Sequence, residues 1–225
     1  MTMRRPAQIP LDLPANSSLT RDDLVVGAAN SLAVDAVDAW PAWPHPVVVI
    51  VGPPGSGKTH LAAAWSETSG AVDWTGDLPD ETPFAVRVED IDRAPYDESA
   101  LFALVNAARL GGGSVLLTSR TPPSALDIKL PDLRSRVRAA TVVELQVPDE
   151  DLLFGVIVKL AADRQIGIDP KMIAYALARM ERSFQAASEF VARVDREALA
   201  TKEKIGRPLV QRILAEMEVE TKSSS

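Results

Sequence analysis

Runs of consecutive apolar residues alternate along most of the chain with segments of helical periodicity. An unbroken apolar run predicts a strand at 47–51 that is covered on both faces, and mainly apolar stretches predict strands at 84–88, 114–119 and 141–145, with a short one at 71–74. The apolar spacing predicts helices at about 28–38, 57–67 and 97–109, and 132–138 is predicted to form a short helix or a turn. Strands that alternate with helices in this way predict an α/β fold whose parallel sheet has helices on both faces.

The pattern changes near Pro148, where the predicted strands end. Beyond it, apolar positions with helical spacing occur in four segments, around 152–160, 173–180, 184–198 and 210–217. We therefore predict four parts: an extended arm at 1–20, an α/β core at 21–148, a small four-helix lid domain at 149–220 and a disordered tail at 221–225.

Composition narrows the classes of function. The chain has 225 residues and a net charge of −7, which makes stand-alone binding to duplex DNA a poor expectation. It has no cysteine, so it has neither a disulfide framework nor thiolate chemistry. No apolar stretch reaches the length of about 18 residues that a membrane span needs, and no signal peptide is visible. We therefore expect a cytoplasmic protein.

A glycine-rich loop joins the first long apolar run to a predicted helix. It consists of Gly52, Pro53, Pro54, Gly55, Ser56, Gly57, Lys58 and Thr59. This spacing is that of a P-loop, in which glycines let backbone N–H groups and a helix N-terminus surround phosphate oxygens. Lys58 would reach the outer phosphates, and the Thr59 hydroxyl can ligate Mg²⁺. The alternative, a surface turn that binds nothing, does not require Lys-Thr at this position.

Two other strand ends carry candidate groups. Glu89 and Asp90 follow the second long strand, where P-loop proteins place acids on the metal side and on the water side of the nucleotide. Glu89 is one methylene longer than the usual aspartate, so we expect little or no hydrolysis by this chain itself. Ser119 ends the third strand and could sense the γ-phosphate. The alternatives are acids that merely end a strand, and a serine that caps the next turn.

Arginines supply a further set of candidates. Arg134, Arg136 and Arg138 occupy alternating positions, and a guanidinium suits the charge of a phosphoryl transition state, including one on a neighbouring molecule. Arg182 precedes the third lid helix and could reach back to the nucleotide. A solvated basic turn and a surface salt bridge are the alternatives. The chain has two histidines, His45 and His60, and we assign both to packing or to the surface. His60 follows Thr59 directly, so we also count it with the nucleotide-binding loop.

The arm at 1–20 contains a possible recognition motif. Its prolines favour an extended backbone, in which Ile9, Leu11 and Leu13 project on one side. Together with Gln8 they could dock into a partner's groove, although an arm packed on its own domain remains the alternative.

These segments together resemble the AAA+ module of the bacterial replication initiator family DnaA, and more closely its regulatory homologues, the Hda (HdaA) group. The resemblance covers nearly the whole chain. The matching segments are 24–30, which borders the adenine in the family, 52–59 (Walker A), 89–90 (Walker B), 117–120 (sensor 1), 133–136 (arginine-finger box), 181–184 (sensor 2) and 8–13 (sliding-clamp motif).

The resemblance implies specific roles and partners. It assigns the arginine-finger role to Arg136 and the sensor 2 role to Arg182. It also places Val26 and Asn30 next to the nucleotide. It implies ADP (or ATP) with Mg²⁺ held at Thr59 and Glu89, and partners that include DnaA and the β sliding clamp of DNA polymerase III. DNA would then be contacted only through the clamp, and a homodimer that pairs through the nucleotide sites is conceivable.

The chain differs from the initiator in two further respects. It ends after the predicted lid, so we expect no DNA-binding domain and no origin recognition. The stretch between Walker A and Walker B is short and is expected to lack a helix. The function implied is a regulator that promotes hydrolysis of DnaA-bound ATP. The alternatives are a stand-alone P-loop ATPase or kinase, and an adaptor that loads replication proteins on DNA.

Overall fold

The α/β part consists of five strands and the helices between them. The computed structural model describes residues 19–201 and 203–223. Its first elements are α1 (Ser31–Asp38), β1 (Val47–Val51), α2 (Lys58–Ser69), β2 (Val72–Asp73), β3 (Phe84–Val88), α3 (Glu98–Ala107), the π-helical turn η1 (Ala108–Gly112), β4 (Gly113–Ser119), α4 (Pro131–Arg138) and β5 (Thr141–Glu144). The predicted strands are all present, and no helix lies between α2 and β3 in this described stretch.

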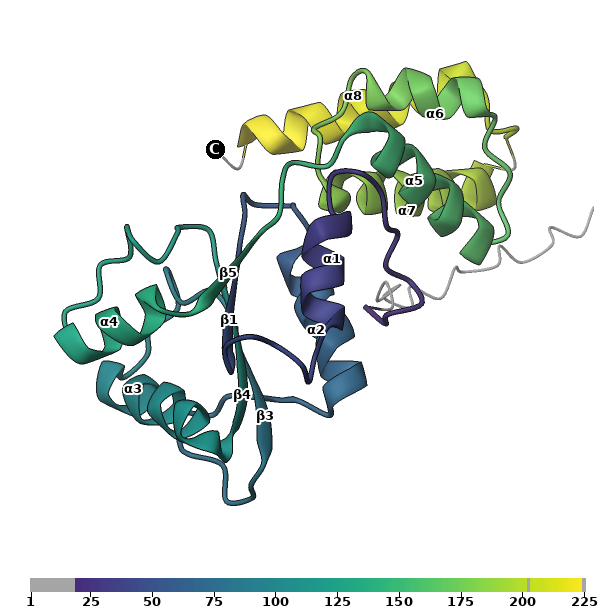
Figure 1. The fold of residues 1–225 in the computed structure, drawn as a ribbon. Helices are drawn as coiled ribbons and strands as arrows, with labels where there is room; N and C mark the ends of the chain where they lie inside the picture. Colours follow the sequence, from purple (N-terminus) through teal and green to yellow (C-terminus); the bar gives the residue numbers. More distant parts are fainter. Residues whose placement is uncertain (1–18, 202, 224–225) are drawn as a thin grey trace, which may run out of the picture.

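All neighbouring strands pair in parallel, in the order β2-β3-β4-β1-β5. Helices α1 and α2 cover one face of the sheet, and α3 and α4 cover the other (Figure 1). β1 is an interior strand between β4 and β5, and each of its residues is buried because helices pack on both faces. Its neighbours β4 and β5 place the ends of three parallel strands at the same edge of the sheet, next to the glycine-rich loop.

Each face of the sheet has its own apolar core. The odd-numbered residues of β1 point toward α3 and α4, where they pack with side chains that include Leu104 and Leu133. Val48 and Ile50 point the other way and pack with Leu61 of α2 and with helix α1. The period of two along a strand therefore divides one apolar run between two cores.

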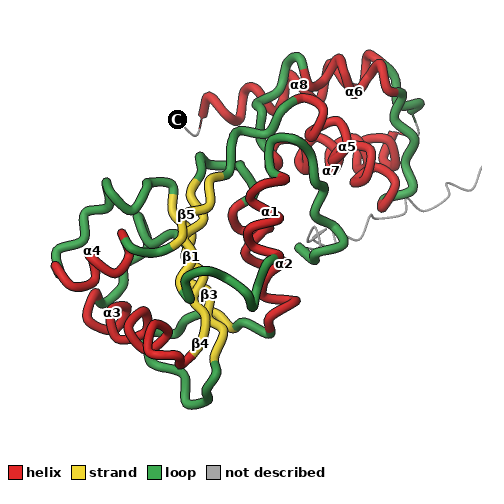
Figure 2. The backbone as a smooth tube through the Cα atoms, in the orientation of Figure 1, coloured by secondary structure: helices red, strands yellow, loops and turns green. Residues whose placement is uncertain are grey.

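Four helices form the lid, α5 (Glu150–Asp163), α6 (Pro170–Leu177), α7 (Phe184–Thr201) and α8 (Arg207–Ser223). Figure 2 shows this all-helical part beside the mixed part of the fold. A third core fills it, with Phe190 fully buried among apolar residues of all four helices. Within the described residues, no helix is both long enough and apolar enough to cross a membrane.

The helix boundaries differ from the prediction in ways that local bonds explain. α1 starts at Ser31 rather than near residue 28, because 27–30 form a turn in which Asn30 N–H donates to the Gly27 carbonyl at 3.2 Å. α3 ends at Ala107, and the chain continues through η1, where Gly111 adopts a left-handed φ of 92°. α8 continues to Ser223, past the predicted end of the lid.

Candidate nucleotide-binding site

The glycine-rich loop connects β1 to α2, the strand–loop–helix order of a P-loop. Gly55 and Gly57 have φ values of +72° and +92°, which side-chain-bearing residues rarely adopt, and Gly57 is the N-cap of α2. The loop therefore needs glycine at these two positions. The first turn of α2 directs its free N–H groups toward the space that the loop encloses.

Lys58 is buried at the start of α2 and bonds to the loop itself. Its Nζ donates to the carbonyl oxygens of Gly52 (2.7 Å) and Pro53 (2.9 Å). Burial lowers the pKa of this ammonium, and the nearby carboxylate of Asp90 opposes that shift. A phosphate would offer the ammonium stronger, charged acceptors at the same place.

The Ser56 side chain tests whether the loop fits an anionic ligand. Its hydroxyl oxygen is buried and has no hydrogen-bond partner among the described residues. Buried polar atoms without partners are rare in folded proteins, and a phosphate oxygen would satisfy this one. The chemistry of the loop therefore fits an anionic ligand.

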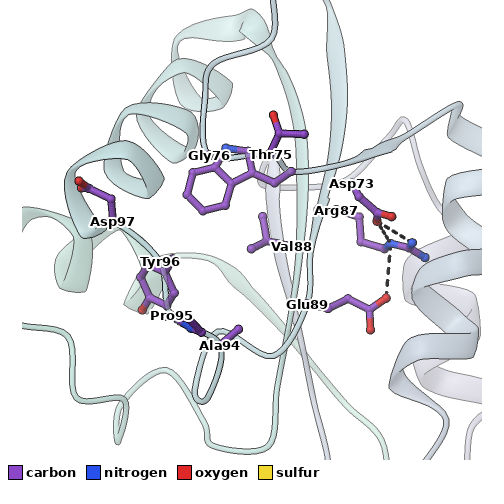
Figure 3. A pocket seen from close by; sticks show the side chains of 11 residues that line it. Asp73, Thr75, Gly76, Arg87, Val88, Glu89, Ala94, Pro95, Tyr96 and Asp97 are labelled. Atoms are coloured by element: carbon purple, nitrogen blue, oxygen red, sulfur yellow. Dashed lines mark hydrogen bonds and ion pairs between the residues drawn. The ribbon is translucent and has the colours of Figure 1, made fainter.

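Thr59 and Glu89 meet at the edge of the site. The Thr59 hydroxyl donates to a Glu89 carboxylate oxygen at 2.8 Å, and the longer glutamate side chain spans the distance between β3 and α2. Figure 3 shows Glu89 together with Arg87 and Asp73. Arg87 lies behind Glu89, at 3.5 Å, and also pairs with Asp73 at 2.6 Å. A cavity of about 550 Å³ opens beside these residues and is also lined by Trp74.

The Thr59–Glu89 pair fits a Mg²⁺ site that is completed by the nucleotide. A hydroxyl and a carboxylate are ligand types that Mg²⁺ prefers, and Mg²⁺ is commonly held by one or two such groups together with substrate phosphates and water. No cluster of three acidic, histidine or cysteine side chains suited to a metal occurs among the described residues. Bound Mg²⁺ would neutralise phosphate charge, and Thr59 and Glu89 would orient it.

Asp90 and Ser119 lie at the carboxyl ends of β3 and β4. Asp90 has a left-handed φ of 54°, and its N–H donates to the Thr118 hydroxyl at 2.9 Å. Its carboxylate pairs with Arg93 at 2.7 Å. The buried Ser119 hydroxyl donates to the Thr121 carbonyl at 2.6 Å, the contact expected of a serine that caps the next turn. Its sensor role stays a prediction.

The lid touches the loop through two residues that sequence reasoning did not single out. Phe184 N–H donates to the Gly55 carbonyl at 3.2 Å, and Ser183 is buried against the same glycine. Arg182 pairs with Glu150 at 2.7 Å and has a side chain that is 60% exposed, and its role at the nucleotide stays a prediction. One indication of Ser183 and Phe184 lies in the sequence, because both belong to the same 181–184 segment as Arg182.

Replacing Gly55 with alanine should separate the lid from the loop. A Cβ at this position would lie 2.5 Å from the Ser183 Cβ, whereas a Cβ on Gly70, whose φ is also about 70°, would have no neighbour within 4 Å. We expect Gly70→Ala to lower the free energy of unfolding by about 1–2 kcal/mol through backbone strain alone. Gly55→Ala should lose a further ~1–3 kcal/mol from the clash.

Thermal and denaturant unfolding of the nucleotide-free protein would measure the difference between these two matched variants. Equal losses would show that the lid is not held against the loop in solution.

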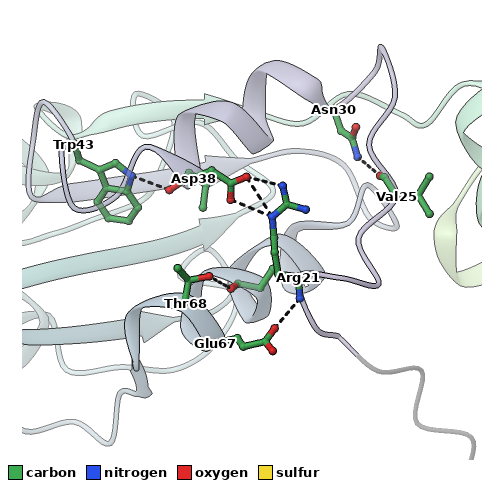
Figure 4. Close-up of polar contacts among 9 residues, drawn as sticks. Arg21, Val25, Asn30, Asp38, Trp43, Glu67 and Thr68 are labelled. Atoms are coloured by element: carbon green, nitrogen blue, oxygen red, sulfur yellow. Dashed lines mark hydrogen bonds and ion pairs between the residues drawn. The ribbon is translucent and has the colours of Figure 1, made fainter.

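The N-terminal side of the site is organised by Asn30 (Figure 4). Its buried side chain accepts from Gly27 N–H at 2.8 Å and donates to the Val25 carbonyl at 2.9 Å, so it shapes the turn. Val26 projects from the same turn and is 47% exposed. The His60 ring contacts the Thr20 carbonyl at 3.0 Å, and burial is the main cause that lowers the pKa of this histidine.

Residues 19–30 also fasten the core to the lid. Arg21 N–H donates to Glu67 of α2 at 2.7 Å, and its guanidinium pairs with Asp38 of α1 at 2.6 Å (Figure 4). Farther along, Asp23 pairs with Lys159 of α5. The segment therefore joins both helices on one face of the sheet to the first lid helix.

The three arginines on α4 differ in their partners. Arg134 donates to the Ile128 carbonyl at 3.4 Å, and Arg138 donates to the Ser124 carbonyl at 2.9 Å. The half-buried Arg136 has a guanidinium that makes no hydrogen bond or ion pair with any residue in the described part of the chain. Among these three arginines, it alone has a guanidinium without a partner in the described part of the chain.

Comparison with known proteins finds similarity to DnaA in sequence. No family model matches the chain. The chromosomal replication initiator protein DnaA of Leifsonia xyli is 24% identical over 253 residues, which cover 96% of this chain and 54% of that protein. An uncharacterized protein of Haemophilus influenzae is 26% identical over 189 residues, which cover 76% of this chain and 82% of the relative. The chain therefore spans about half the length of the DnaA protein that it resembles.

Solved structures show the same fold. Domain III of DnaA from Thermotoga maritima superposes with a TM-score of 0.76 at 17% identity, over 90% of this chain and 98% of that domain. AMPPCP-bound DnaA from Aquifex aeolicus superposes with a TM-score of 0.67 at 18% identity, over 92% of this chain and 71% of that one. The chain thus has the AAA+ fold of DnaA and is similar to DnaA in sequence.

Proposed function

We propose that this chain is a DnaA-related regulator of replication initiation, which binds an adenine nucleotide and promotes hydrolysis of ATP on DnaA. The P-loop geometry, the unpartnered Ser56 hydroxyl and the AMPPCP-bound DnaA neighbour support binding of an adenine nucleotide. The similarity to DnaA supports a role in replication. ADP is the favoured ligand, with Mg²⁺ at Thr59 and Glu89, and the site would be used in the bacterial cytoplasm.

The observation that carries the regulatory role is the availability of Arg136. Its neighbours Arg134 and Arg138 use donors on carbonyls of their own chain, whereas the Arg136 guanidinium has no partner among the described residues. An arginine finger stabilises charge on another molecule's phosphates, so it must leave its own chain with free donors. Arg136 meets that requirement, and DnaA-bound ATP is the target that we propose.

A tether would bring this arginine to its target. The arm motif of Gln8, Ile9, Leu11 and Leu13 lies outside the described residues, and we propose that it binds the β sliding clamp. Tethering to a clamp loaded on DNA raises the local concentration of the regulator without requiring any new contact at the hydrolysis site. DNA is then reached only through the clamp.

The test is hydrolysis of ATP bound to DnaA, with and without this chain and with the clamp either loaded on DNA or omitted. We expect strong stimulation only when both the chain and the loaded clamp are present. Replacing Gln8, Leu11 and Leu13 together with alanine should abolish capture by the clamp and reduce the stimulation to the level seen without clamp. Retained clamp binding by this variant would refute the tether.

Separate measurements on the isolated chain distinguish the other classes of function. Rapid ATP turnover by the isolated chain, with or without a small-molecule acceptor, would indicate a stand-alone P-loop ATPase or kinase. Salt-dependent binding to DNA without the clamp would indicate an adaptor that loads proteins on DNA. Size measurement with and without ADP would show whether the chain forms a homodimer.

A further inference from the structure

The turn that follows β3 is held rigidly against the next strand. Asp90 N–H donates to the Thr118 hydroxyl at 2.9 Å, and Ile91 N–H donates to the Thr118 carbonyl at 3.0 Å. The Asp90 carbonyl accepts from the N–H groups of both Arg93 and Ala94, each at 2.8 Å. The left-handed φ of Asp90 makes this tight reversal possible.

This backbone brings the Arg93 side chain onto the carboxylate of Asp90. Arg93 Nη2 lies 2.7 Å from Asp90 Oδ2, within hydrogen-bonding distance. The other acids of the turn also have partners, since Glu89 accepts from Thr59 and Asp92 accepts from Arg120 N–H at 3.1 Å. Among these acids, only Asp90 has a side-chain guanidinium from its own turn as its partner.

The pair lies beside the nucleotide loop. Burial is the main cause that lowers the pKa of Lys58, but Asp90 acts to raise that pKa and Arg93 acts to lower it. Both charges are therefore close enough to influence the ammonium that would meet the outer phosphates. Replacing Arg93 would therefore change the electrostatic environment of Lys58 and Asp90.

Hydrolysis needs a free acceptor at the position of Asp90. A water oxygen bonds to the γ-phosphorus, the bond from that phosphorus to the bridging oxygen breaks, and the water loses a proton that the released phosphate finally carries. A carboxylate assists by accepting a hydrogen bond from this water. The Asp90 oxygen Oδ2 already accepts from the Arg93 guanidinium, so this oxygen is not free to accept from the water.

We infer that Arg93 is a positioning residue that withholds Asp90 from the attacking water and so preserves the nucleotide bound to this chain. The inference rests on the proposed function, in which the chain's own nucleotide serves regulation and the hydrolysed ATP is on DnaA. It gives the slow hydrolysis expected from Glu89 a second cause, one that a single substitution can remove.

The pair is well suited to a mutational test. The side chains of Arg93 and Asp90 are 50% and 36% exposed, and exposed ion pairs contribute little to stability. Removing the guanidinium should therefore leave the fold and the nucleotide affinity intact. Arg109, an exposed arginine in η1 on a different element, provides a matched control for loss of one surface charge.

The experiment measures ATP turnover and the affinity for ATP of the isolated chain. Arg93→Ala should raise kcat by about threefold to fivefold with KM unchanged, the scale that an exposed ion pair can supply. Arg93→Lys should stay slow because it keeps a cation beside Asp90, and Arg109→Ala should match the wild type. Adding Asp90→Asn to Arg93→Ala should return turnover to the wild-type level or below, since the released carboxylate is then lost.

Unchanged or reduced turnover in an Arg93→Ala variant that still binds ATP would overturn the inference, and reduced turnover would identify Arg93 as a stabiliser of the phosphates instead. A wild-type chain that binds no nucleotide would overturn both this inference and the proposed function. A chain that binds nucleotide but does not act on DnaA would overturn the proposed function alone, and the turnover of Arg93→Ala would still decide this inference.

Discussion

Replacing Arg136 with alanine is expected to abolish clamp-dependent hydrolysis of DnaA-bound ATP, with a loss of roughly 10³-fold or more, the scale reported for arginine fingers supplied by a second molecule. The guanidinium lies on α4 without a partner among the described residues, so its removal breaks no contact seen within them. Folding, nucleotide binding and capture by the clamp should all remain as in the wild type.

The same helix provides the control. Arg138 is two positions away and is exposed, but its guanidinium donates to the Ser124 carbonyl at 2.9 Å. Arg138→Ala removes an equal charge from α4, and we expect it to keep most of the stimulation. Normal stimulation by Arg136→Ala, or an equal loss in both variants, would show that no single arginine of α4 acts as the finger.

Replacing Lys58 with alanine is expected to weaken binding of adenine nucleotide by about 100-fold, equivalent to about 2.7 kcal/mol. The buried ammonium lies at the start of α2 and can exchange its two carbonyl acceptors for charged phosphate oxygens. The effect on nucleotide affinity should exceed that on stability, because the neutral bonds to Gly52 and Pro53 contribute less than bonds to phosphate.

Calorimetric titration with ADP and with ATP would measure this loss, and Lys171→Ala would control for removing one lysine. Lys171 is exposed in the first turn of α6 and lies on the lid. Unchanged affinity in Lys58→Ala would mean that the loop does not hold phosphate, which would remove the basis of the proposed nucleotide site. A collapse of the fold would instead appear in the unfolding curves.

Much of the fold could be predicted because its signals are local. The apolar runs correspond to β1, β3, β4 and β5, and the change to purely helical spacing after Pro148 corresponds to the lid. Errors were confined to the ends of elements, where a single hydrogen bond decides the boundary. Asn30, for example, closes a turn with Gly27 and delays the start of α1.

Side-chain roles were harder to predict, because they depend on partners that spacing does not reveal. Arg182 pairs with Glu150 and the Ser119 hydroxyl bonds within its own turn, two contacts that the spacing of residues does not reveal. The roles of both residues at the phosphates stay predictions. The contact between the lid and the loop is made by Ser183 and Phe184, which follow Arg182 in the chain, and it is set by packing between distant segments.

By itself, the sequence determined the strand, the glycine loop and the helix around Lys58, because their requirements in φ, burial and residue type are met within a dozen consecutive positions. Only the tertiary structure decided which arginine of α4 has no partner among the described residues, which lid residues cover Gly55, and that Arg93 holds Asp90. Those outcomes depend on the directions of side chains and on contacts between distant segments, which the spacing of residues along a chain does not specify.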